Sequence, residues 1–164
     1  MFDIFYQSVY YRSMDVFQDW LNQLAQELKL GEKLALDEKN RCFLLFDETM
    51  LVEMEYRPDS NTFQFKGNLG NIPENKVKEI YPKLLESNLG WKETRSATLG
   101  LQQYSEKVLL VQNIPMKSCD YAHFNKLLES FVNTFEYWVK NLQDLQVSQA
   151  ANQTHKNQNF EIRA

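Results

Sequence analysis

The chain has 164 residues, of which 43% are hydrophobic and 24% are charged, and its formal net charge is −4. This length suits one domain with a substantial core, and the acidic balance argues against nucleic-acid binding, which needs a basic footprint. The apolar runs are too short to cross a bilayer, so no membrane insertion is expected. The first residues lack the pattern of a signal peptide, which favours a cytosolic protein.

The first predicted element is a helix over residues 13–30. Ser13 is a good N-cap, and Gly31 is a plausible residue to end the helix. Residues 1–12 precede it as an aromatic-rich extension with no predicted structure. The apolar positions of the helix recur at helical spacing and comprise Met14, Phe17, Leu21, Leu24 and Leu28, widened by Val16 and Trp20.

Three strands are predicted next, and they form an antiparallel meander. Residues 42–46 are apolar on both faces, so each face needs a cover from elsewhere. Residues 50–57 alternate between apolar and mostly charged positions, and residues 62–66 alternate around Phe63 and Phe65. Short polar turns at 47–49 and 58–61 join the strands.

A second helix is predicted to begin at Pro73, where the missing N–H costs nothing. Gly67 and Gly70 before it are expected in a turn. Pro82 falls inside the helix, where it removes a backbone hydrogen bond and predicts a kink. The apolar face of this helix comprises Val77, Ile80, Tyr81, Leu84, Leu85 and Leu89.

Two strands, 97–104 and 107–113, and a long helix over 120–145 complete the domain. The inward face of the last helix comprises Tyr121, Phe124, Leu127, Leu128, Phe131, Phe135, Trp138, Val139 and Leu142. The order α-β-β-β-α-β-β-α predicts an α+β domain over 13–147, with a twisted antiparallel sheet packed against three helices. Residues 148–164 are polar and rich in Gln and Asn, which predicts a flexible tail.

The sequence offers little catalytic chemistry. Cys119, Asp120 and His123 lie close together in the chain, so a small hydrolase is one hypothesis, but such sites are recognised by geometry rather than by sequence proximity. Cys42 and Cys119 lack the spacing of a metal site or a redox pair. The glycines match no phosphate-binding loop. We therefore expect no catalytic residue, no metal and no cofactor.

Three passages and the last helix carry a family resemblance. They are FKGNLGNIP at 65–73, LLESNLGW at 84–91 and TLGLQQYSEKVLLVQNIP at 98–115, followed by the helix that bears Phe131, Phe135 and Trp138. Together with the order of elements, they resemble the class I type III secretion chaperones, the Tir chaperone-like family, over residues 14–145. The N-terminal extension, Pro82 and the polar tail depart from the family pattern.

The resemblance implies a bacterial, cytoplasmic homodimer that takes part in virulence. Such chaperones bind the extended N-terminal segment of one or more secreted effector proteins, keep it soluble and deliver it to the export apparatus, through an ATPase or sorting component. A heterodimer with a paralogous chain remains open. The alternative function is a regulatory interaction module that sequesters a transcription factor or another chaperone.

The resemblance also implies which surfaces meet partners. An extended peptide binds by adding a strand to a sheet edge, and adaptable apolar grooves accept its side chains. The alternative for each candidate is simple core packing. The effector-binding candidates are Phe17, Trp20, Leu21, Phe43, Leu45, Met50 and Met54. The dimer-interface candidates are Val77, Ile80, Tyr81, Leu84, Leu85 and Trp91.

Overall fold

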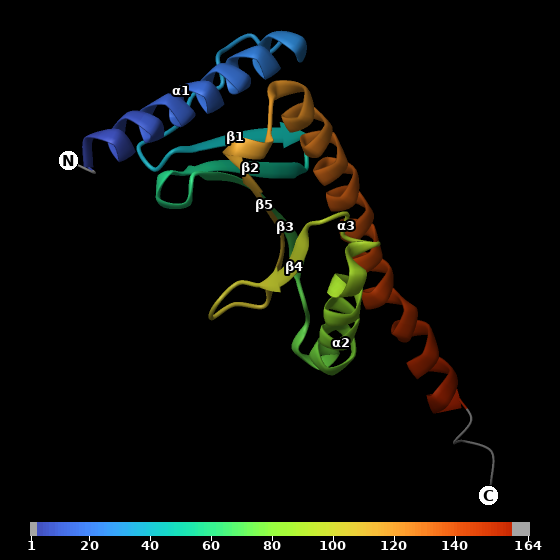
Figure 1. The fold of residues 1–164 in the computed structure, drawn as a ribbon. Helices are drawn as coiled ribbons and strands as arrows, with labels where there is room; N and C mark the ends of the chain where they lie inside the picture. Colours follow the sequence, from blue (N-terminus) through green and yellow to red (C-terminus); the bar gives the residue numbers. More distant parts are fainter. Residues whose placement is uncertain (1–2, 159–164) are drawn as a thin grey trace, which may run out of the picture.

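The computed structural model describes the backbone of residues 3–158 and the side chains of residues 13–145. Five strands form one antiparallel sheet in the order β1-β2-β3-β5-β4, so β1 and β4 are its edges. Figure 1 shows α1 at the β1–β2 end of the molecule, α2 beside β4, and the long α3 running past both. The predicted order of elements and the α+β class are confirmed.

The first helix, α1 (Asp3–Glu27), begins ten residues earlier than expected, inside the N-terminal extension, and ends before Leu30. Backbone bonds continue the last turn, from Leu28 N to Leu24 O at 2.9 Å. Lys29 then adopts a positive φ of 52°. The left-handed residue at the helix end is therefore Lys29 rather than the predicted Gly31.

The meander consists of β1 (Arg41–Phe46), β2 (Met50–Arg57) and β3 (Thr62–Asn71). The predicted turn at Gly67 and Gly70 is wrong, because both glycines lie inside β3. A register shift between Asn68 and Gly70 marks a bulge, and Gly70 has a φ of 115°, which only glycine adopts readily. The predicted strand stops at residue 66 because a bulge and two glycines interrupt the alternation of apolar and polar residues beyond it.

The chain enters the second helix through Pro73, which is extended, and a 3-10 turn at Glu74–Lys76. The helix α2 (Val77–Asn88) then continues without interruption through Pro82, so the predicted kink stays a prediction. Gly90 follows with a φ of 72°. The helix α2 therefore ends within the LLESNLGW passage at 84–91.

The last elements are β4 (Thr98–Leu101), β5 (Lys107–Pro115) and α3 (Tyr121–Gln158). A five-residue loop, 102–106, joins the two strands, so β4 is shorter than predicted. The helix α3 does not end at Leu145 but continues to Gln158, through part of the segment expected to be a tail.

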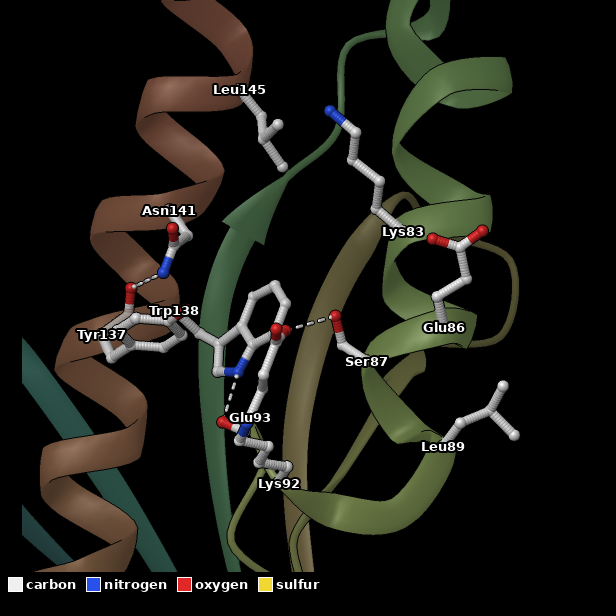
Figure 2. A pocket seen from close by; sticks show the side chains of 10 residues that line it. All are labelled: Lys83, Glu86, Ser87, Leu89, Lys92, Glu93, Tyr137, Trp138, Asn141 and Leu145. Atoms are coloured by element: carbon white, nitrogen blue, oxygen red, sulfur yellow. Dashed lines mark hydrogen bonds between the residues drawn. The ribbon is translucent and has the colours of Figure 1, made fainter.

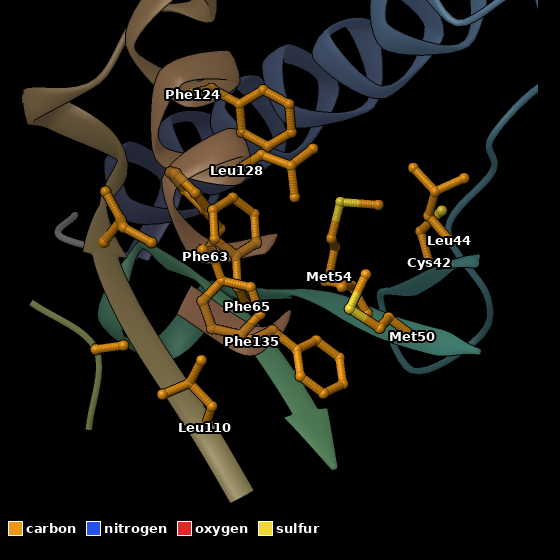
Figure 3. Packing of buried hydrophobic residues seen from close by; sticks show 14 of the residues in the cluster. Cys42, Leu44, Met50, Met54, Phe63, Phe65, Leu110, Phe124, Leu128 and Phe135 are labelled. Atoms are coloured by element: carbon orange, nitrogen blue, oxygen red, sulfur yellow. The ribbon is translucent and has the colours of Figure 1, made fainter. Parts of the chain in front are cut away.

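The core lies between one face of the sheet and the helices α1 and α3 (Figure 3). Aromatic rings join the three: Phe17 of α1 stacks on Phe63 of β3 at 5.4 Å between ring centroids, and Phe65 lies 5.5 Å from Phe131 of α3. The predicted inward face of α3 is confirmed: six of its nine residues are buried and three are half-buried against the core. The buried ones are Phe124, Leu128, Phe131, Phe135, Trp138 and Leu142, and the half-buried ones are Tyr121, Leu127 and Val139.

Candidate protein-binding surfaces

The second face of the sheet is partly apolar and open. In β1, Cys42 and Leu44 point into the core, whereas Phe43 and Leu45 are 43% and 55% exposed. Leu51, which pairs with Leu45 across β1 and β2, is 50% exposed. Strand β1 is apolar on both faces, as the sequence indicates, but α1 and α3 cover only one of them. We call the surface formed by Phe43, Leu45 and Leu51 the β1 patch.

A shallow pocket of about 250 Å³ lies beside the β1 patch. In its lining, Lys66 Nζ lies 2.7 Å from Glu53 Oε2. Outside the pocket, the guanidinium of Arg41 lies 5.5 Å from the ring centroid of Phe43. The pocket thus combines apolar walls with a neutralised charge pair. Its lining comprises Phe43, Thr49, Leu51, Glu53, Lys66, Asn68 and Leu109.

No strand of the described residues 3–158 pairs with the outer edge of β1, so backbone groups there lack a strand partner. Antiparallel pairs alternate between those that exchange hydrogen bonds and those that do not. Tyr56 N donates to Asn40 O at 2.9 Å, so the alternation directs the N–H and C=O of residues 41, 43 and 45 away from β2. The open backbone positions therefore coincide with the exposed side chains Phe43 and Leu45.

Asp37 occupies the first of these outward positions. Arg41 N donates to Asp37 Oδ1 and Asp37 N donates to Arg41 O, both at 2.8 Å. The Arg41 guanidinium also donates to Asp37 Oδ2, and this hydrogen bond lowers the pKa of Asp37 below its ordinary value of 3.8. The edge is consequently open at Phe43 and Leu45 but closed at Arg41.

The other five effector-binding candidates lie in the core. Phe17, Leu21 and Met54 are fully buried, and Trp20 and Met50 are less than a tenth exposed. Met50 and Met54 pack near Phe65 and Phe135 (Figure 3). The core alternative therefore holds for these five residues. Leu51 and Leu109 were missed, although Leu51 is the apolar exception on the charged face of β2.

A second candidate surface lies where α2 approaches α3. A pocket of about 490 Å³ opens between the two helices (Figure 2). Glu93 organises its wall, because its carbonyl accepts the indole N–H of Trp138 at 3.3 Å and its carboxylate accepts the hydroxyl of Ser87 at 2.9 Å. Tyr137, 48% exposed, packs edge-on against Trp138 at 5.7 Å.

The dimer-interface candidates divide between the core and the surface. Ile80 and Leu84 are buried in the core, and Val77 and Tyr81 are half-buried against it. Leu85 and Trp91 are 69% and 59% exposed. Leu89, which the sequence placed only on the apolar face of the helix, is the most exposed of this group at 78%. We call Leu85, Leu89 and Trp91 the α2 ridge.

The Cys119–Asp120–His123 segment serves the start of α3. Asp120 Oδ1 accepts the backbone N–H of His123 at 2.8 Å, which is the bond of a helix N-cap. The Cys119 thiol donates to Asp120 O at 3.4 Å, and burial raises its pKa to about 11, helped by the Asp120 charge. Nucleophilic cysteines usually have a lowered pKa, so the raised pKa of Cys119 and the capping role of Asp120 both disfavour the hydrolase hypothesis.

Two further site classes find no support in the described part of the chain. Among its residues, no group of three or more His, Cys, Asp or Glu side chains is arranged to hold a metal ion. None of the described helices combines the length and the apolar character that a membrane span requires.

Several solved structures share the fold. One chain of the HopA1–SchA chaperone–effector complex aligns with a TM-score of 0.64 at 16% identity, over 79% of this chain and 97% of that chain. A chain of the ExsC–ExsE complex aligns with a TM-score of 0.66 at 22% identity, over 77% and 92%. A chain of the ExoU–SpcU complex from the type III secretion system of Pseudomonas aeruginosa aligns with a TM-score of 0.57 at 19% identity, over 75% and 94%.

A search of curated proteins found no sequence match. The family model of the Tir chaperone protein (CesT) family, in contrast, matches residues 19–139, which include all five strands, α2 and parts of α1 and α3. The chain therefore belongs to the Tir chaperone protein (CesT) family of type III secretion chaperones.

Proposed function

We propose that this chain is a bacterial cytoplasmic chaperone that binds the extended N-terminal segment of one or more secreted effectors. It keeps that segment soluble and delivers it to the export apparatus, where an ATPase or sorting component receives the complex. Membership of the family and the fold shared with chains of chaperone–effector complexes support the class of function. The observation that carries the proposal is the coincidence of an open edge and exposed apolar side chains in β1.

Strand addition at β1 explains how an unfolded client is held. Main-chain hydrogen bonds to residues 43 and 45 supply affinity for almost any extended sequence, and side-chain pockets supply preference. The exposed Phe43, Leu45 and Leu51 offer apolar contacts, and the adjacent pocket of about 250 Å³ accepts one side chain of the client. A binding mode dominated by the backbone suits a chaperone with more than one effector.

We further propose that two copies associate through the α2 ridge. Leu85, Leu89 and Trp91 are exposed apolar residues close together in the chain, at the end of α2 and just beyond it. Apolar residues clustered on a surface commonly mark a protein interface. A homodimer would bring two β1 patches into one assembly, which suits the wrapping of a long extended segment. Pairing with a paralogous chain instead would use the same ridge.

Co-expression with the N-terminal segments of proteins secreted by the same bacterium tests the chaperone function. The expected result is a soluble complex with at least one segment that is insoluble alone. If the folded protein captures none of them, the proposal fails. If it instead co-purifies only with a transcription factor or another chaperone, the regulatory alternative replaces the export function.

Two variants at one position test the binding mode. Leu45→Pro removes an outward N–H that β2 does not use, and proline is tolerated at such edge positions. Leu45→Ala removes only side-chain contacts. Strand addition predicts that the proline variant loses clearly more client affinity than the alanine variant. Leu101→Ala, an exposed leucine of β4, is the matched control and should retain binding. Equal losses at Leu45→Pro and Leu45→Ala would contradict strand addition.

A further inference from the structure

The β4 edge of the sheet is closed by a side chain of α2. Asn88, the last residue of α2, donates from Nδ2 to Leu99 O at 3.0 Å, and its Oδ1 accepts the N–H of Leu99 at 2.9 Å. One side-chain amide thus satisfies both backbone groups of one strand residue. In Figure 1, α2 lies alongside β4 at this end of the sheet.

The two groups that Asn88 binds are those that a sixth strand would need. Gln102 N donates to Lys107 O at 3.0 Å, so residues 98 and 100 face β5, and the alternation directs Leu99 and Leu101 outward. Because β4 has four residues, these two are its only outward positions. An Asn amide carries a donor and an acceptor in one plane, as a peptide unit does. Asn88 therefore imitates a residue of a neighbouring strand.

The two edges of the sheet therefore differ in how many of their outward backbone positions are open. At β1, Asp37 closes the outward position at Arg41 but leaves residues 43 and 45 open, next to exposed side chains. At β4, Asn88 closes the more central of the two outward positions, and the Leu99 side chain is buried. The one outward position that remains open, at Leu101, offers too few backbone hydrogen bonds to pair with another strand.

We propose that Asn88 is a specificity-determining residue that closes the β4 edge to strand pairing and leaves β1 as the sheet edge that accepts one. The proposal deepens the proposed function, since it states why a client strand would add at one edge only. Exposed edges otherwise pair with other chains, including further copies of the same protein. The closure also keeps copies of this chain from joining through β4.

The test needs no client, so its failure is distinguishable from failure of the chaperone function. Asn88→Ala removes both hydrogen bonds, and Asn88→Asp keeps the acceptor for Leu99 N–H but removes the donor. Ser87→Ala is the matched control, because Ser87 bonds to Glu93 and not to the sheet. Amide hydrogen exchange at Leu99 and sedimentation over a range of concentrations are the measurements, with circular dichroism to establish folding.

For Asn88→Ala we expect exchange at Leu99 to accelerate by about tenfold or more, and association to exceed that of the wild type as β4 edges pair. Adding Leu101→Pro, which removes the second outward N–H, should return the association to the wild-type level. If Asn88→Ala does not fold, Asn88→Asp should show the same two changes, faster exchange at Leu99 and stronger association, to a smaller extent. A folded variant that associates no more than the wild type would overturn the proposal, because the body of α2 alone would then close the edge.

Discussion

The ring of Phe135 on α3 occupies the place where a side chain at Gly67 of β3 would lie. A Cβ atom at Gly67 would stand 2.7 Å from Phe135 Cε1 and 2.8 Å from Cδ1, closer than real Cβ atoms approach other atoms. Phe135 is itself buried at 2% exposure, so its ring has little room to move aside. The absence of a side chain in mid-strand thus allows α3 to approach the sheet.

Gly67→Ala is therefore expected to destabilise the fold. The added methyl group overpacks the contact with Phe135, which should lower the free energy of unfolding by about 1–3 kcal/mol. Urea denaturation followed by circular dichroism measures this change. Gly100→Ala is the control, because a Cβ built there meets no atom of the described residues within 4 Å, apart from its chain neighbours. Equal stability of the two variants would show that Phe135 repacks freely.

The α2 helix permits a paired test of dimer formation. Leu84 is 4% exposed and belongs to the core, whereas Leu85 is 69% exposed on the α2 ridge. Leu85→Asp should leave the monomer folded, since exposed substitutions usually change stability by about 0.5 kcal/mol or less, but should weaken association. Leu84→Asp should instead unfold the domain, because it buries an unpaired charge.

Sedimentation gives the outcome for Leu85→Asp. The wild type should sediment at about twice the chain mass of 19.5 kDa, and the variant should shift toward the monomer at the same concentration. A wild-type monomer at micromolar concentration would contradict the proposed dimer. A dimer unaffected by Leu85→Asp would place the interface elsewhere.

Pro82→Ala is expected to stabilise the protein. Proline cannot donate to the carbonyl of Lys78 one turn earlier, and alanine restores that donor and a favourable helix propensity. Pro82 is exposed, so the substitution removes no core contact. The free energy of unfolding should rise by about 1–3 kcal/mol in chemical denaturation. Lys78→Ala is the control: it also replaces a side chain on the surface of α2, but it restores no backbone donor. A loss of stability would mean that the proline ring fits a helix already bent at this point.

The two cysteines are expected to react slowly with thiol reagents. Burial raises the pKa of both Cys42 and Cys119 to about 11, from an ordinary value of 9.0. At pH 8 both remain protonated, and the thiolate is the reactive form. Reaction with a chromogenic disulfide should be much faster in denaturant than in the native state.

The raised thiol pKa also predicts a pH dependence of stability. Because folding favours the protonated thiols, their contribution to the free energy of unfolding should be full below pH 9 and should fall as the pH rises toward 11.

The sequence predicts the elements better than it predicts their environments. Alternation in β2 and helical spacing in α3 identify these elements because each pattern is local to its own segment. Periodicity shows which residues share a face, but not which face another element covers. Phe43 and Met54 were equal candidates for a binding surface, yet α1 and α3 bury the second and leave the first exposed. The role of Gly67 depends on Phe135, which is distant in the chain, so no local pattern reveals it.

The three tryptophans lie in three different environments. Trp20 is 8% exposed among Phe17, Phe63 and Phe124, Trp138 is 4% exposed and bonded to Glu93, and Trp91 is 59% exposed on the α2 ridge. Indole emission shifts to longer wavelength on contact with water, so the protein carries its own fluorescent reporters. Unfolding should shift the emission of Trp20 and Trp138 toward the red. Burial of the ridge against a second copy should shift that of Trp91 toward the blue, so folding and assembly are distinguishable by the sign of the spectral change.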